Sequence, residues 1–105
     1  METIDISVPS GSDDAIVRAV EDSAAQVGLT VTLRTTTSTY PGSVHWHFKK
    51  PDERRGTLEL TYWPKNKRLW AKIQSGRKAD WIHASLKQLA SAVAGKAKSK
   101  VGKRK

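Results

Sequence analysis

The stretch TYWPKNKRLWAKIQ, residues 61–74, decides the fold, because it has the pattern of two β-strands joined by a tight turn. The turn-forming run Pro-Lys-Asn-Lys separates two segments in which apolar and polar side chains alternate. A period of two residues indicates strands with one core-facing and one outward face. Leu69, Ala71 and Ile73 therefore belong to the core, and Trp70 belongs to the opposite face.

The turn also predicts the register of this hairpin. A two-residue turn and a four-residue loop between the two strands pair the same residues. Either way, the outward pairs are Trp63 with Arg68, Thr61 with Trp70, and Glu59 with Lys72. We therefore expect two tryptophans to point toward solvent, with cations beside them.

Strand and helix patterns continue on both sides of the hairpin. Alternation also marks LTVTLRT (29–35), SVHWHFKK (43–50) and a short run near the N-terminus with Ile4, Ile6 and Val8. In LTVTLRT the alternation places Val31 and Leu33 toward the core and Arg34 on the outward face. Apolar stripes at helical spacing predict helices over residues 12–27 and 78–94, the second ended by Gly95.

The predicted order β-α-β-β-β-β-α indicates a two-layer α+β domain. We expect an antiparallel five-stranded sheet with both helices on one face. The order over residues 3–94 resembles the TATA-binding-protein-like or helix-grip topology, a resemblance that implies little about function. Residues 1–95 are expected to form one domain, followed by a disordered basic tail over 96–105.

Charge is unevenly distributed along the chain, whose formal net charge is +9. Six of the ten acidic residues lie in the first 22, whereas the last ten residues hold six cations and no acid. Such polarity favours an anionic partner. The chain has no cysteine, no secretory signal and no apolar run of the ~18 residues that a membrane span requires, which favours a cytoplasmic location without membrane contact.

The outward sheet face carries the functional prediction, because an open sheet with aromatic and cationic side chains is typical of single-stranded DNA or RNA binding. Trp63 and Trp70 are expected to stack on bases. Phosphate contacts are expected from Arg68, Lys72, Lys49, Lys65 and Lys67, and hydrogen bonds from His45 and His47.

Two alternatives use the same face. A homodimer or another protein partner is one, because tryptophan and arginine are also enriched at protein interfaces. The other is a metal-dependent enzyme centred on His45 and His47, which share a face of one strand. The sequence predicts no third ligand beside them, since Glu59 aligns two positions away and His83 lies on a helix across the sheet. We therefore expect no metal, no cofactor, no catalytic residue and no enzymatic activity.

Overall fold

The computed structural model describes residues 2–53, 55–73 and 80–102, and for residues 96–102 it describes the backbone alone. Its elements follow in the order β1 (Glu2–Ile6), α1 (Asp13–Gln26), β2 (Thr30–Thr35), β3 (Val44–Lys49), β4 (Leu58–Trp63), β5 (Arg68–Ile73) and α2 (Asp80–Gly102). A short 3₁₀ turn at Pro64–Asn66 joins β4 to β5. The predicted order of elements is confirmed.

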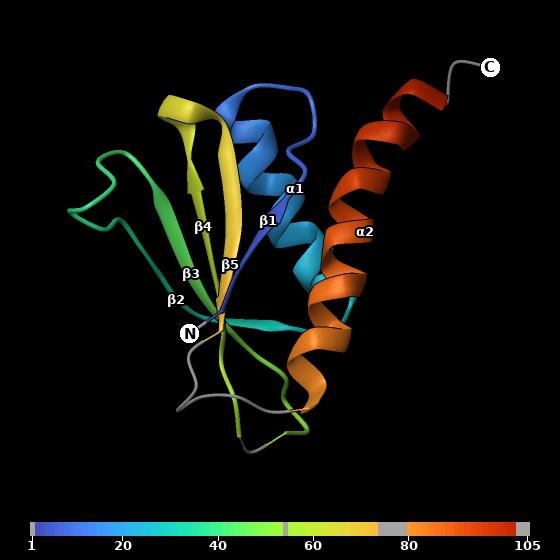
Figure 1. Ribbon diagram of the computed structural model, residues 1–105. Helices are drawn as coiled ribbons and strands as arrows, with labels where there is room; N and C mark the ends of the chain where they lie inside the picture. The colour runs from blue at the N-terminus through green and yellow to red at the C-terminus, as the bar shows by residue number, and fades with distance from the viewer. Residues whose placement is uncertain (1, 54, 74–79, 103–105) are drawn as a thin grey trace.

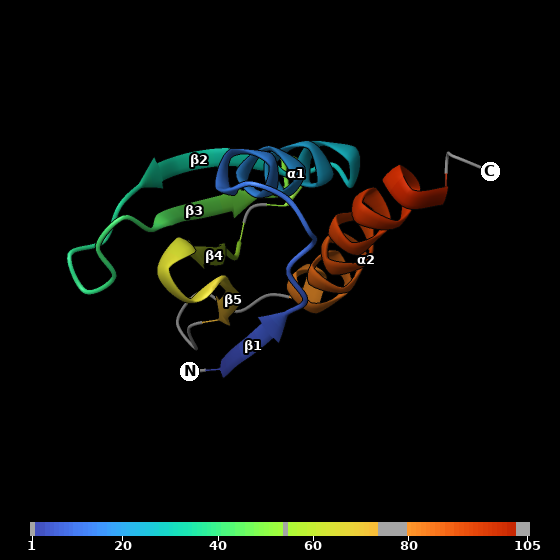
Figure 2. The same ribbon diagram turned by 90° about the horizontal axis from the view of Figure 1, so that it is seen from above.

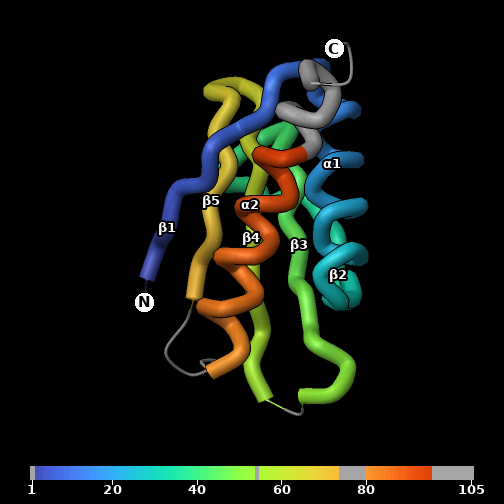
Figure 3. Tube along the Cα trace, turned by 90° about the vertical axis from the view of Figure 1, so that its right-hand side faces the viewer, coloured from blue at the N-terminus to red at the C-terminus, as the bar shows by residue number. Residues whose placement is uncertain are grey.

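The five strands form one antiparallel sheet in the order β1-β5-β4-β3-β2 (Figure 1). Both helices cover the same face of this sheet, with α1 beside β2 and β3 and α2 across the middle (Figures 2 and 3). The predicted two-layer α+β architecture is confirmed. Each helix buries its apolar stripe against the sheet, and we call the opposite side the outer face.

The β4–β5 hairpin has the predicted register. Trp63 pairs with Arg68, Thr61 with Trp70, and Glu59 with Lys72. Lys67 closes the turn in the left-handed region with φ 50°, and its amide donates to the Pro64 carbonyl at 3.1 Å. This local bond fixes the loop length and hence the pairing.

A β-bulge between Val31 and Leu33 in β2 reverses the side-chain alternation in the second half of that strand. The Thr32 hydroxyl donates to the His47 carbonyl at 3.2 Å within the irregular stretch. Beyond it, Leu33 pairs with His47 and turns outward, whereas Arg34 pairs with Trp46 on the helix side. The prediction that Arg34 lies on the outer face is therefore wrong.

Arg34 instead contributes to a polar contact beneath α1. Its guanidinium lies 2.9 Å from Oε2 of Glu21, and the same oxygen accepts from Nε1 of Trp46 at 3.0 Å. Trp46 is fully buried, as predicted from its position in the alternation. Glu21 thus supplies the acceptor that a buried indole N–H requires.

The first helix, α1, largely follows its predicted limits. The Ser12 hydroxyl caps α1 by accepting from the Ala15 amide at 3.1 Å, and Gly28 follows the helix with φ 84°. However, α2 passes Gly95 and continues to Gly102, because one glycine costs a helix only about 1 kcal/mol. Two parts of the sequence predictions, the start of this helix at residue 78 and the last three residues of the tail, lie outside the described residues.

Candidate functional site on the outer sheet face

Two groups of side chains lie on the outer face, on strands β3, β4 and β5 and the connection before β3. The aromatic cluster consists of Tyr40, Trp63 and Trp70. The histidine cluster consists of His45, His47 and Glu59. The sequence places most of these residues on this face, but their exposure differs from the prediction.

Trp70 lies on the outer face but is covered, with only 3% of its surface exposed. The ring of Tyr40, from the connection between β2 and β3, meets it edge-on with centroids 4.9 Å apart. The Arg68 guanidinium lies over the ring with its Cζ 4.6 Å from the centroid. The prediction that Trp70 points to solvent is therefore wrong, and the missed residue is Tyr40, which stands in a sequence typical of a turn.

Trp63 is only half-buried and lies at the hairpin end of the cluster. Its Nε1 donates to the Pro41 carbonyl at 3.2 Å, and Tyr40 meets its ring at a centroid distance of 5.0 Å. Nζ of Lys65 lies 6.0 Å from the centroid of the ring. The structure thus holds this indole in one orientation beside an exposed cation.

Two of the predicted phosphate-binding cations have acidic partners from early in the chain. Nε of Arg68 lies 3.0 Å from Oδ1 of Asp5, and Nζ of Lys67 lies 2.9 Å from Oδ1 of Asp13. All four side chains remain about half-exposed or more. These pairs were not predicted, because they join residues more than fifty positions apart.

The other predicted cations have different surroundings. Lys65 is exposed at the turn, whereas Lys49 and Lys72 are half-buried. Nζ of Lys49 donates to the Gly56 carbonyl at 3.0 Å, and Lys72 stands opposite Glu59 in the sheet. The exposed cations Lys65 and Arg68 therefore lie at the hairpin end, and the half-buried Lys49 and Lys72 lie farther along the strands.

The Asp13 carboxylate also accepts a hydrogen bond from the hydroxyl of the buried Tyr62, with the two oxygens 2.7 Å apart. The hydrogen bonds from Tyr62 and Lys67 hold the pKa of Asp13 below its usual value of 3.8. Burial of the phenol and the hydrogen bond to Asp13 raise the pKa of Tyr62. This contact ties the start of α1 to the hairpin that carries Trp63.

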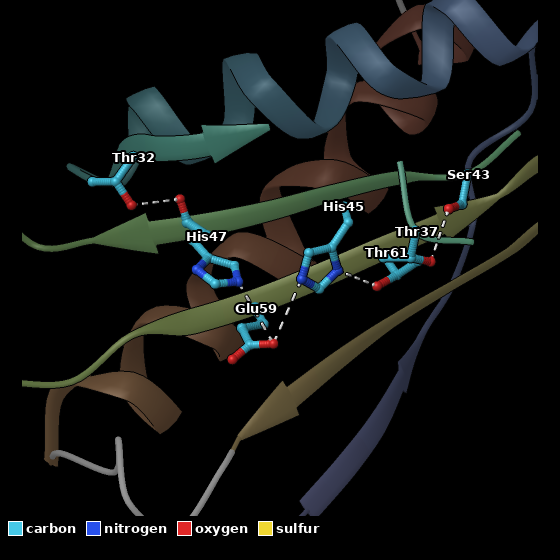
Figure 4. A network of polar contacts seen from close by, with 7 residues as sticks. All are labelled: Thr32, Thr37, Ser43, His45, His47, Glu59 and Thr61. Atoms are coloured by element: carbon cyan, nitrogen blue, oxygen red, sulfur yellow. Dashed lines mark hydrogen bonds and ion pairs between the residues drawn. The ribbon is translucent and has the colours of Figure 1, made fainter. Parts of the chain in front are cut away.

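The histidine cluster is assembled from two neighbouring strands (Figure 4). His47 on β3 pairs directly with Glu59 on β4, so the predicted offset of two positions is wrong. Nε2 of His45 and of His47 lie 3.6 and 3.8 Å from Oε1 of Glu59. Nδ1 of His45 lies 2.8 Å from the Thr61 hydroxyl, which holds the ring with Nε2 toward the carboxylate.

Burial decreases from the carboxylate outward in this cluster. The side chain of Glu59 is 5% exposed, that of His45 14% and that of His47 23%. Burial, followed by the charge of His47, lowers the pKa of His45 below its ordinary value of 6.5, although Glu59 opposes the shift. The cluster is therefore a largely desolvated carboxylate flanked by two imidazoles that reach the surface.

Comparisons with known proteins match no protein-family model, no curated protein and no solved structure. The topological resemblance to the TATA-binding-protein-like arrangement is not confirmed by them. In the described part of the chain, neither helix combines the length and apolar character needed to cross a membrane.

Proposed function

We propose that this protein binds single-stranded nucleic acid through the hairpin end of its outer sheet face. The observation that carries the proposal is the joint position of Trp63 and Tyr40 beside two exposed cations, Lys65 and Arg68. Both helices lie on the other side of the sheet (Figure 2). Aromatic rings beside cations suit a strand whose bases stack while its phosphates meet positive charge.

Trp63 is the base-stacking residue in this proposal. It is half-buried, and its orientation is held by Pro41 and Tyr40, so little side-chain entropy remains to be lost on binding. Stacking of one base on such a ring contributes about 1–3 kcal/mol. Trp70, being covered, acts by supporting Tyr40 from the sheet.

The ion pairs of Arg68 and Lys67 do not prevent phosphate binding. Both cations remain half-exposed, and an exposed ion pair contributes only about 0–1 kcal/mol. A phosphate that replaces Asp5 or Asp13 gains a charge-assisted bond and releases condensed counterions. Lys49, Lys72 and the two histidines extend the path along the face, and the net charge of +9 favours encounter with a polyanion.

Fluorescence titration with a labelled single-stranded oligonucleotide over a range of salt concentrations tests the proposal. Trp63→Ala should weaken binding by roughly 5- to 150-fold, the equivalent of the lost stacking. Lys65→Gln should reduce the slope of log affinity against log salt by about 0.7. Lys87→Gln is the matched control, because it removes one charge from the exposed side of α2.

The proposal would be contradicted if the wild-type protein did not bind the oligonucleotide at low salt. It would also be contradicted if Lys65→Gln and Lys87→Gln reduced the salt slope equally. Deletion of residues 96–105 separates the sheet from the basic tail. We expect the truncated chain to bind more weakly while keeping its dependence on Trp63. If the truncated chain loses all binding and full-length Trp63→Ala binds normally, the tail is the site.

One observation favours the protein-interaction alternative. Val31 and Leu33 are the exposed large hydrophobic residues of the described chain, at 40% and 43%, and both lie on the edge strand β2. An unpaired edge with apolar side chains can pair with the same edge of a second copy. Sedimentation velocity tests whether the protein forms this homodimer. A monomer at all concentrations excludes the homodimer, and a dimer that is lost in Leu33→Lys supports it.

A further inference from the structure

The histidine cluster has the composition and spacing of a transition-metal site. Its two imidazoles and one carboxylate each offer a ligand atom, and these atoms all lie within 4.8 Å of one another. They come from adjacent strands in register, His47 directly opposite Glu59 and His45 two residues earlier on the same face. Strand pairing therefore brings the three side chains together on one face of the sheet (Figure 4).

We propose that His45, His47 and Glu59 bind one divalent transition-metal ion, with zinc the ion that the donors fit best. Two imidazole nitrogens and one carboxylate oxygen suit zinc and its neighbours in the first transition row, whereas calcium and magnesium prefer oxygen ligands alone. Two histidines and a glutamate are also a known ligand set of zinc sites that keep one position open.

The distances between the ligand atoms support an ion more than direct bonds between the side chains. Oε1 of Glu59 lies 3.6 Å from Nε2 of His45 and 3.8 Å from Nε2 of His47, beyond good hydrogen-bond length. Two ligands on one tetrahedral zinc are about 3.4 Å apart, given bond lengths of about 2.0–2.1 Å. A contraction of a few tenths of an ångström therefore brings each nitrogen to that separation from the carboxylate oxygen. The two imidazoles, whose ligand atoms lie within 4.8 Å of the others, approach each other by rotation of the partly exposed His47 side chain.

The surroundings of the cluster orient its ligands. The contact of 2.8 Å between Nδ1 of His45 and the Thr61 hydroxyl fixes the ring and leaves Nε2 directed toward the carboxylate. Hydrogen bonds from the second nitrogen of a ligating histidine perform this role in metal sites. Thr61 is itself 5% exposed, so its hydroxyl has little freedom to turn away.

The exposure of the cluster indicates where the remaining coordination position lies. Glu59 is almost fully buried, while His47 reaches the surface with 23% of its side chain exposed. An ion between them is held from the sheet side and open to water on the other. Lys72, opposite Glu59 in the register, adds a positive charge that favours an anionic group at the open position.

The test uses the full chain, purified without an affinity tag and treated with a chelator. Cobalt(II) is titrated while its visible absorption reports tetrahedral coordination, and zinc is then added in competition. We expect one equivalent of cobalt to bind and zinc to displace it. His47→Ala should weaken binding more than the 10- to 100-fold typical of an outer-shell change, and Thr61→Val should fall within that range.

His83→Ala is the matched control, because His83 lies on α2 and contacts Glu2 at 3.0 Å, away from the cluster. We expect it to bind cobalt as the wild type does. Absence of saturable one-to-one binding to the wild type would overturn the proposal and leave the cluster as a histidine–carboxylate ion pair. Equal affinity in His47→Ala and the wild type would also overturn it.

Folding is monitored by circular dichroism in every variant. If Glu59→Gln unfolds, His47→Ala decides the question, since His47 is the most exposed member of the cluster. The metal ligands do not include Trp63, the base-stacking residue, although His45 and His47 also extend the proposed nucleic-acid path. Trp63→Ala, which weakens oligonucleotide binding, should therefore bind cobalt as the wild type does. His47→Ala, which weakens cobalt binding, should keep Trp63 in place.

Discussion

Tyr40→Ala removes the ring that lies against both Trp63 and Trp70, at centroid distances of 5.0 and 4.9 Å. Each edge-on aromatic pair contributes about 0.5–1.5 kcal/mol, so the free energy of unfolding should fall by about 1–3 kcal/mol. For a domain of this size, Tm falls by roughly 4 °C for each kcal/mol lost. The substitution also uncovers Trp70, which is only 3% exposed in the wild type.

Urea unfolding followed by circular dichroism measures the loss, and acrylamide quenching of tryptophan fluorescence measures the uncovering of Trp70. Tyr40→Phe is the control, because it keeps the ring and both ring contacts, and we expect near wild-type stability and quenching. If Tyr40→Ala matched the wild type in both measurements, the aromatic cluster would not be packed as described, and the proposed support of Trp63 would be refuted.

Two further predictions concern polar contacts between α1 and the sheet. Glu21→Ala should lower the free energy of unfolding by about 1–3 kcal/mol, because it leaves the buried Trp46 indole without its acceptor. Arg34→Ala breaks only an exposed ion pair and should lower it by less than about 1 kcal/mol. Equal losses for the two variants in urea titrations would contradict this. Asp13→Asn should destabilise the protein most above pH 3.8, since the lowered folded-state pKa of Asp13 gives stability that is lost as pH falls through that pKa. The difference from wild type should therefore shrink in acid, and a difference independent of pH from 3 to 7 would contradict the lowered pKa of Asp13 in the folded protein.

The hairpin and the layer arrangement were predictable because local signals determine them. Alternation assigns the faces of β4 and β5, and the loop from Pro64 to Lys67 sets their pairing without reference to the rest of the chain. Apolar stripes likewise indicate which side of each helix packs on the sheet.

The departures from prediction depend on contacts between distant residues. Arg34 faces the helices because of a bulge that alternation does not reveal. Trp70 is covered by Tyr40, which lies thirty residues earlier in a connection.

The position of Glu59 opposite His47 was missed for a different reason. A shift of two residues between strands leaves every side chain on the same face, so the period-two pattern cannot detect it. The histidine cluster therefore became visible only when the pairing of β3 with β4 was known.

We propose that Trp63 contacts the nucleic acid at the hairpin end of the outer face. NMR spectra of the ¹⁵N-labelled protein should resolve indole N–H signals for its four tryptophans. On addition of a single-stranded oligonucleotide at low salt, we expect the Trp63 signal to move. The signals of Trp46 and Trp81, whose N–H groups donate to Glu21 and the Arg55 carbonyl, should stay in place. A Trp63 signal that does not move at saturating oligonucleotide would contradict the proposed site.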